Sequence, residues 1–141
     1  MPRPTLFLDT SFVVALENTS DRHHRIAKKL DKKLLKQEAR LLLHSGIVLE
    51  IGDGFGRLER RKKGVELLAR FHREDGYQIE PISSDLLQQA QELYRERGDK
   101  EWGLTDCVSF VLMTRHGIKE ALTADVHFRQ AGFRALLLES S

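Results

Sequence analysis

Short apolar runs alternate with helix-like segments along the whole of this 141-residue chain. The runs with the composition of buried strands are residues 6–9, 41–43, 77–81, 119–123 and 134–138. The segments between them are helix-like, and in one of them Ile26, Leu30 and Leu34 mark a single apolar helix face. Strands that alternate with helices are typical of a parallel sheet covered by helices, so the sequence predicts an α/β fold.

The expected helices begin near residues whose side chains can cap them. We expect helices over residues 11–16, after 21, from 46 past 60, over 64–72, over 84–97, over 106–113 and around 128. The candidate caps are Thr10 or Ser11, Asp21, Ser45, Ser83 or Ser84, and Thr105. Residues 107–113 are apolar nearly all round, which predicts a central, buried helix in which Cys107 is a packed residue rather than a nucleophile.

Length and composition indicate one domain over residues 1–141. No apolar run approaches the roughly 18 residues of a membrane span, and the first residues do not form a secretory signal. The single cysteine suits a reducing compartment, so we expect a cytoplasmic protein without a membrane segment. A net charge of only +2 is too small for a protein that coats DNA without specificity.

Four carboxylates lie where an apolar run meets a helix, or inside a helix that follows such a run. Asp9 and Asp125 end predicted strands, Asp106 opens the apolar helix, and Glu50 lies about one turn into another helix. Acids in apolar surroundings are costly unless they are paired, hydrogen-bonded or bound to a cation. Ligands of open parallel sheets bind beyond the carboxyl ends of the strands, so these four acids can face one cleft.

A divalent cation would resolve the repulsion within such a cleft. Two unit charges 4 Å apart repel by about 4 kcal/mol at an effective dielectric constant near 20. Oxygen ligands without a matching cysteine and histidine set favour Mg²⁺ or Mn²⁺ over Zn²⁺. The predicted chemistry is metal-assisted phosphodiester hydrolysis. Simpler roles stay open, because Asp106 can favour its helix dipole and Asp9 can cap a helix.

Two basic clusters offer places for a phosphate backbone to rest, although both also fit ordinary solvated helix faces. They consist of Lys28, Lys29, Lys32, Lys33 and Lys36, and of Arg57, Arg60, Arg61, Lys62 and Lys63. The stretch Gly52-Asp53-Gly54-Phe55-Gly56 lacks the known phosphate-loop patterns. It favours close helix packing or local looseness instead.

Four segments of the chain resemble the PIN-domain ribonucleases and, within that family, the VapC-type toxins of bacterial toxin–antitoxin pairs. The segments are Leu8-Asp9-Thr10-Ser11, the helix around Glu50, Trp102 to Phe110, and Leu122 to Phe128. The resemblance covers essentially the whole chain, and residues 102–110 carry it most specifically. The order and approximate spacing of the four acids match as well.

The resemblance implies a three-layer α/β/α sandwich and an RNA substrate. It also implies that Asp9, Glu50, Asp106 and Asp125 hold Mg²⁺ or Mn²⁺, that hydroxyls of Thr10, Ser11 and Thr105 support them, and that Asp99 can add an outer charge. Family members usually form homodimers and are neutralised by a small antitoxin whose tail enters the cleft. We expect these partners here too.

Three other functions are alternatives to a metal-dependent ribonuclease. A phosphatase of the haloacid dehalogenase type needs a second aspartate where this chain has Ser11. A PIN-like module that binds RNA or protein without cutting typically lacks one or more of the acids, and a DNA-directed nuclease has a similar fold.

His127, two residues after Asp125, can touch substrate or the outer shell of the metal, or simply pack. His23, His24 and His72 are expected at the surface.

Overall fold

The computed structural model describes residues 3–139, and the elements in this range alternate as the sequence predicts. In chain order they are β1 (Thr5–Leu8), α1 (Thr10–Glu17), α2 (His24–Lys36), β2 (Arg40–His44), α3 (Ser45–Gly54), α4 (Leu58–Arg73), β3 (Tyr77–Glu80), α5 (Ser84–Glu96), α6 (Leu104–His116), β4 (Glu120–Leu122), α7 (Val126–Gln130), β5 (Arg134–Ala135) and a 3₁₀ turn (Leu136–Leu138).

The sheet has the order β3-β2-β1-β4-β5, and every neighbouring pair is parallel. The chain builds outward from β1 to β2 and β3, then returns to the other side of β1 to add β4 and β5. The strand order therefore reverses between β1 and β4. In open α/β sheets this is where ligands bind, beyond the carboxyl ends of the strands.

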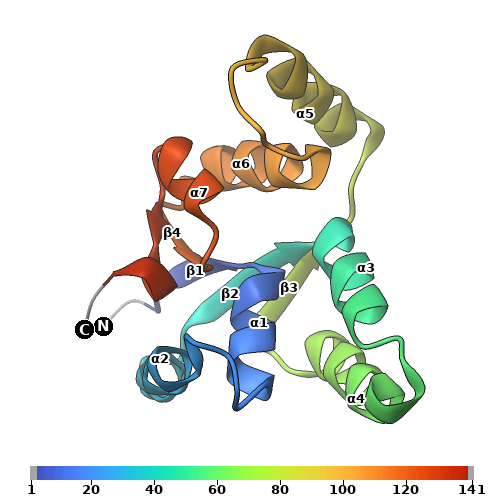
Figure 1. The fold of residues 1–141 in the computed structure, drawn as a ribbon. Coiled ribbons are helices and arrows are strands. Elements are labelled where there is room, and N and C mark those ends of the chain that lie inside the picture. Colours follow the sequence, from blue (N-terminus) through green and yellow to red (C-terminus); the bar gives the residue numbers. More distant parts are fainter. Residues whose placement is uncertain (1–2, 140–141) are drawn as a thin grey trace.

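The helices form a layer on each face of the sheet (Figure 1). Helices α1 to α4 cover one face, and α6 and α7 cover the other, with α5 packed on α6. This division follows from right-handed crossovers, because the chain moves across the sheet in one direction before β3 and in the other after it. The expected three-layer α/β/α sandwich with a parallel sheet is confirmed.

The predicted apolar helix is central, as expected. Five apolar side chains of α6 are buried, among them Cys107, which is fully buried. The Phe110 ring meets the rings of Trp102 and Phe128 edge to face, each at a centroid distance of 5.0 Å. Gly117 ends the helix with a φ of +66°, a conformation that glycine adopts at little cost.

The expectation of one helix from residue 46 past 60 is wrong, as is that of a separate helix over residues 64–72. The chain leaves α3 after Gly54 and enters α4 at Leu58, and α4 includes residues 64–72. The Gly56 carbonyl accepts hydrogen bonds from the Arg61 side chain and so fixes the turn between the helices. Of the glycines in the 52–56 stretch, Gly54 has open space around it and a Cβ at Gly52 would reach only Leu68 at 3.8 Å, which fits the looser of the two expectations. The closest approach is at Gly64 in α4, where an added Cβ would lie 2.8 Å from Cβ of Phe55.

Most expected caps differ from those in the structure. Ser83 caps α5 as predicted, accepting a hydrogen bond from the amide of Leu86 at 3.1 Å. His44, rather than Ser45, caps α3, and Gly103 rather than Thr105 precedes α6. Asp21 accepts from the His23 amide ahead of α2. The hydroxyls near the start of α1 donate to carboxylates and do not cap the amides of α1.

The last predicted strand is shorter than expected. β5 ends at Ala135, and the residues up to Leu138 form the 3₁₀ turn. The amide of Leu137 donates to the carbonyl of Thr123, so this turn supports the loop after β4. Within residues 3–139, no helix is long and apolar enough to cross a membrane.

Candidate active site

The four predicted acids line one cleft of about 550 Å³ at the carboxyl ends of β1 and β4. Asp9 directly follows β1, and Asp125 comes three residues after the end of β4. Glu50 lies in α3, and Asp106 lies in the first turn of α6. Other lining residues are Thr10, Ser11, Val14, Asp21, His23, Asp53 and Ala124. The switch point of the sheet thus brings together acids that are far apart in the sequence.

Asp9 is the buried member of this group, with 9% of its surface exposed. Its Oδ2 accepts hydrogen bonds from the hydroxyls of Thr123 (2.7 Å) and Ser11 (3.0 Å). The same hydroxyl oxygens accept from the amides of Asp125 and Ala124. This network joins the loop after β1 to the loop after β4, and it leaves Oδ1 of Asp9 for the cleft.

Burial raises the pKa of Asp9 from 3.8 to about 6. Desolvation is the largest cause, and the negative charges of Glu50 and Asp125 raise the pKa further, against the two hydroxyl hydrogen bonds that lower it. A cation close to Asp9 would oppose all of these raising effects.

Thr10 and Ser11 both contact the acids, whereas Thr105 has a different contact. The Thr10 hydroxyl donates to Oε1 of Glu50 at 2.7 Å and so ties α1 to α3. Thr105 is not among the residues that line the cleft, and its carbonyl accepts from the Ser109 hydroxyl at 3.2 Å. Asp99 is exposed and pairs with Arg97 at 3.0 Å, also outside the cleft lining.

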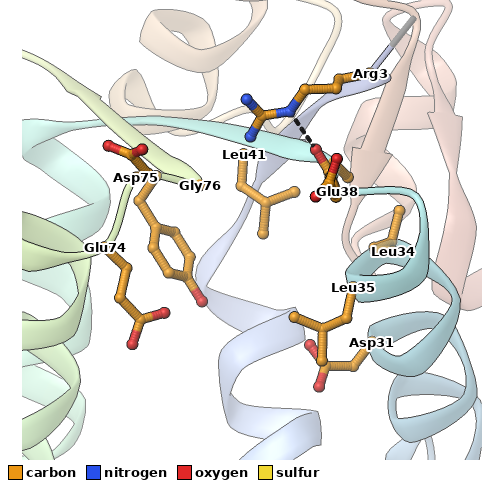
Figure 2. A pocket seen from close by; sticks show the side chains of 11 residues that line it. Arg3, Asp31, Leu34, Leu35, Glu38, Leu41, Glu74, Asp75 and Gly76 are labelled. Atoms are coloured by element: carbon orange, nitrogen blue, oxygen red, sulfur yellow. Dashed lines mark hydrogen bonds between the residues drawn. The ribbon is translucent and has the colours of Figure 1, made fainter. Parts of the chain in front are cut away.

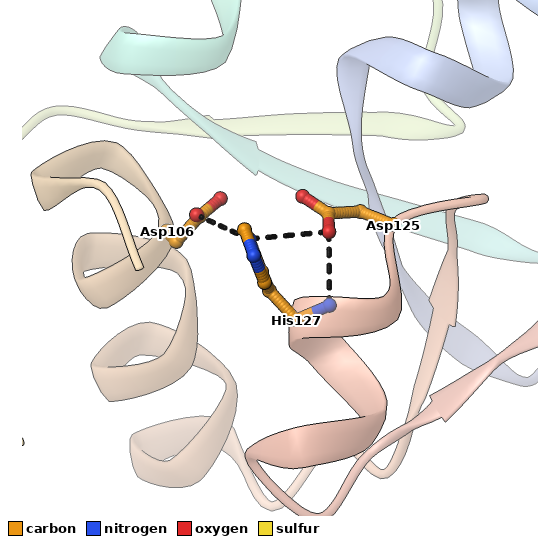
Figure 3. Close-up of side chains that lie close together, drawn as sticks. All are labelled: Asp106, Asp125 and His127. Carbon is orange, nitrogen blue, oxygen red and sulfur yellow. Dashed lines mark hydrogen bonds and ion pairs between the residues drawn. The ribbon is translucent and has the colours of Figure 1, made fainter. Parts of the chain in front are cut away.

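Asp106, Asp125 and His127 form a tight group at one side of the site. Figure 3 shows the His127 ring between the two carboxylates, with its Nδ1 3.3 Å from Oδ2 of Asp106 and 3.3 Å from Oδ1 of Asp125. Each of these oxygens also accepts from a backbone amide, that of Gly103 for Asp106 and that of His127 for Asp125. Burial, followed by the charge of Asp125, raises the pKa of Asp106.

These three side chains have the spacing that a cation needs. Their ligand atoms all lie within 4.8 Å of one another, and no other such set occurs in residues 3–139. Adjacent ligands of an octahedral Mg²⁺ lie about 2.9 Å apart, close to the 3.3 Å between the imidazole and each carboxylate. The residues present therefore fit a divalent cation. The expected four-acid cleft exists, but the tightest set contains two acids and a histidine.

His44 is a structural residue of the site that the sequence did not suggest. It is completely buried at the end of β2. Its Nδ1 accepts from the amide of Gly46, so Nε2 carries the proton and donates to the Ser109 hydroxyl at 2.9 Å. Burial lowers the pKa of His44 to about 4, which keeps the ring neutral. The ring thereby joins the start of α3 to α6, the two helices that carry Glu50 and Asp106.

Three further residues of the cleft lining were also missed. Asp53 lies three residues after Glu50 on the same helix face, a spacing that is visible in the sequence. Asp21 was expected only as a helix cap, and His23 only as a surface residue, yet both reach the cleft. His72 is exposed as expected, and Nδ1 of the partly buried His24 donates to the carbonyl oxygen of Ala15 at 2.8 Å.

A second hollow, of about 320 Å³, lies between α2 and the start of β3 (Figure 2). Its wall contains Leu34, Leu41 and Tyr77, and Arg3 closes one side by donating to the carbonyl of Glu38 at 2.7 Å. This hollow is at the amino ends of β2 and β3, away from the cleft. None of the four candidate acids lines it.

Comparison with known proteins gives consistent matches over most of the chain. The PIN domain profile matches residues 6–134. The "23S rRNA-specific endonuclease VapC20" of Mycobacterium tuberculosis is 31% identical over 130 residues, which are 91% of this chain and 95% of that protein. The crystal structure of VapC20, described as a "Sarcin-Ricin loop cleaving toxin", superposes with a TM-score of 0.80 at 27% identity and covers 91% of this chain and 95% of VapC20.

More distant structures share the fold. VapBC2 of Rickettsia felis, solved with a DNA fragment from its promoter, has a TM-score of 0.66 at 15% identity over 93% of this chain and 96% of its own. FitAcB of Neisseria gonorrhoeae has a TM-score of 0.63 at 20% identity over 92% and 94%. At these identities the likeness concerns the arrangement of helices and strands alone.

Proposed function

The chain belongs to the PIN-domain family, and from this we propose that it is a metal-dependent endoribonuclease, the toxin of a type II toxin–antitoxin pair. The observation that carries the proposal is the convergence of Asp9, Glu50, Asp106 and Asp125 on one cleft at the switch point of the sheet. The identity to VapC20 over nearly the whole chain supports the same activity.

We assign each acid a role in holding the cation. Asp9 and Asp106 would be direct ligands of Mg²⁺ or Mn²⁺, and Asp125 would complete the shell or hold a second, weaker metal position. The Thr10 hydroxyl holds the Glu50 carboxylate in place. Glu50 would either be a ligand of the cation or orient the attacking water. A bound divalent cation supplies polarisation of the phosphodiester and a lower pKa for the attacking water. The Ser11 and Thr123 hydroxyls hold the Asp9 carboxylate in place.

The proposed substrate is a structured RNA with an accessible loop, because the relative VapC20 is described as specific for 23S rRNA and cleaves the sarcin–ricin loop. The basic residues at the start of α4 are exposed, and α4 follows the helix that carries Glu50. Such cations bind phosphates without reading sequence. The exposed lysines of α2 form a second face of this kind.

We propose a homodimer, an antitoxin partner and a cytoplasmic location as well. VapBC2, which shares the fold, is described as bound to a DNA fragment from its promoter, and membership of the PIN-domain family supports a toxin role for this chain beside an antitoxin. An RNA substrate of ribosomal type is found in the cytoplasm. An antitoxin segment that carries a positive charge would complement the acidic cleft.

The decisive experiment is cleavage of total RNA by purified, antitoxin-free protein in Mg²⁺, in Mn²⁺ and in EDTA. Asp106→Asn keeps the shape of the side chain but loses its charge, so we expect at least a hundredfold loss of cleavage, on the order of that seen when a catalytic group is removed. Asp99→Asn is the matched control, because Asp99 is exposed and lies outside the cleft lining. It should cleave as the wild type does.

Cleavage by a folded Asp106→Asn protein at the wild-type rate would contradict the site assignment. A folded wild-type protein that binds RNA but cuts none in any metal would identify the chain as a binding module instead. Circular dichroism of each variant separates both results from a failure to fold.

A further inference from the structure

We propose that His127 is a direct nitrogen ligand of the cation, so that this site prefers a first-row transition metal such as Mn²⁺ to Mg²⁺. The inference rests on the proposed metal-dependent function and adds a residue that the four-acid description does not contain. It concerns the group of Asp106, Asp125 and His127 (Figure 3).

The position of the His127 ring is the first argument. Its Nδ1 is equidistant, at 3.3 Å, from one oxygen of each neighbouring carboxylate. A cation that binds these two carboxylate oxygens therefore lies beside this nitrogen as well. About a quarter of the His127 side chain is exposed, so the ring borders solvent that a cation can enter through.

The fixed backbone of α7 is the second argument. Phe128, the next residue, is fully buried and packs its ring against Phe7 and Phe110. The amide of His127 donates to Oδ1 of Asp125, which fixes the relative position of these two ligands. The imidazole is thus placed beside the carboxylates by the fold and is not free to swing away with a flexible loop.

The oriented carboxylates are the third argument. Oδ2 of Asp106 and Oδ1 of Asp125 each already accept one backbone N–H, as ligands of protein metal sites commonly do. Such outer hydrogen bonds set the direction of the lone pairs that remain. Both carboxylates are therefore held in position before any cation arrives.

A nitrogen ligand changes which metal the site selects. Mg²⁺ is a hard cation that binds oxygen and keeps its waters, whereas an imidazole nitrogen is a better ligand for first-row transition metals, with Mn²⁺ the weakest binder among them. Among residues 3–139, His127 is the one nitrogen or sulfur ligand in a potential metal group with these acids. Removing it should weaken the binding of Mn²⁺ much more than that of Mg²⁺.

In the competing arrangement the hydrogen of His127 is on Nδ1 and is shared between the two carboxylates, which then bind the cation without the ring. In that case the ring contacts the acids but not the metal. The two arrangements differ in whether a nitrogen nucleus is coupled directly to the bound ion. Mn²⁺ makes the distinction measurable because it is paramagnetic.

The test is Mn²⁺ titration of the metal-free, full-length protein, followed by electron paramagnetic resonance with electron spin echo detection of ¹⁴N coupling. We expect one directly coordinated imidazole nitrogen in the wild type. His127→Ala should lose that coupling and bind Mn²⁺ roughly 10–100-fold more weakly, while Mg²⁺ binding changes by less than about threefold. His116→Ala is the matched control, since His116 pairs with Glu80 outside the cleft.

Bound Mn²⁺ without ¹⁴N coupling, or equal losses of Mn²⁺ and Mg²⁺ in His127→Ala, would overturn the inference, as would an absence of Mn²⁺ binding. RNA cleavage in Mg²⁺ by the same samples keeps the two proposals apart. Suppose that RNA cleavage is lost in Asp106→Asn, but that Mn²⁺ bound to the wild type shows no ¹⁴N coupling. The nuclease proposal is then retained and the histidine ligand is rejected.

Discussion

Asp9 is a carboxylate that the fold keeps in an unfavourable charged state when no cation is near. Its pKa is about 6 in the folded protein against 3.8 in an ordinary aspartate. A raised pKa means that the folded state holds the proton more tightly than the unfolded state. The contribution of Asp9 to stability is therefore fully present below about pH 3.8 and is lost as the pH rises through 6.

Asp9→Asn should consequently be more stable than the metal-free wild type at pH 7 and similar to it near pH 4. The difference between the two pKa values corresponds to an upper value of about 3 kcal/mol in the free energy of unfolding at pH 7. Asparagine can still accept from the Ser11 and Thr123 hydroxyls. Urea unfolding in EDTA at both pH values measures the effect.

His44 titrates in the same range with the opposite sign, because burial lowers its pKa to about 4. Its stabilising contribution is present above pH 6.5 and is lost as the pH falls through 4. Both proteins contain His44, so this contribution cancels in the comparison of Asp9→Asn with wild type. A stability difference that does not change between pH 4 and 7 would show that Asp9 is not the titrating group.

At the scale of elements, α4 can approach the preceding turn closely because residue 64 is a glycine. A Cβ at Gly64 would lie 2.8 Å from Cβ of Phe55, whereas one at Gly54 would meet nothing within 4 Å. Gly64→Ala should therefore destabilise the protein by about 1–3 kcal/mol, because α4 must move away from the buried Phe55.

Gly54→Ala is the matched control in the neighbouring helix, and it should be neutral or stabilising by up to about 1 kcal/mol. Thermal and urea unfolding of the two variants beside the wild type give the comparison. Equal stability of Gly64→Ala and Gly54→Ala would mean that α4 does not depend on close approach to Phe55.

The sequence predicted which elements form but not where each one ends. Strands such as residues 41–43 are short and apolar, and the segments between the strands have helical periodicity. The alternation of strands and helices could therefore be predicted from the sequence. The break between α3 and α4 was not, because it depends on a turn that the Arg61 side chain fixes to the Gly56 carbonyl. A contact of that kind leaves no periodic pattern.

The residues of the candidate site were likewise only partly predictable from the sequence. Asp9, Glu50, Asp106 and Asp125 were readable because a carboxylate inside or beside an apolar run is unusual, and all four line the cleft. Which atoms come within ligand distance depends on the packing of α7 against α6. His127 was therefore considered only as a neighbour of the site, and the buried role of His44 was not considered at all.

At the scale of the whole molecule, metal binding and folding should be linked. A cation that binds the folded cleft and not the unfolded chain stabilises the protein by about 2.7 kcal/mol when its concentration is 100 times the dissociation constant. Thermal unfolding should therefore shift upward by roughly 10 °C in saturating Mn²⁺ relative to EDTA for a domain of this size. Asp125→Asn, which removes one of the clustered carboxylates, should lose most of this shift.

Differential scanning calorimetry at several Mn²⁺ concentrations is the direct measurement. A shift of the same size in Asp125→Asn would indicate that Mn²⁺ stabilises the protein at another place. A shift that grows with concentration in the wild type alone would locate the linkage in the cleft.

The hydrogen bond between Asp9 and Thr123 joins residues 114 positions apart, at the junction of β1 and β4. Asp9 and Glu50 are synthesised well before Asp106, and the strand that leads into the Thr123 loop and Asp125 come later still. A growing chain that has not yet added β4 holds at most three of its four acids and no assembled cleft. The order of the strands thus delays assembly of the cleft until both β4 and Asp125 have been synthesised.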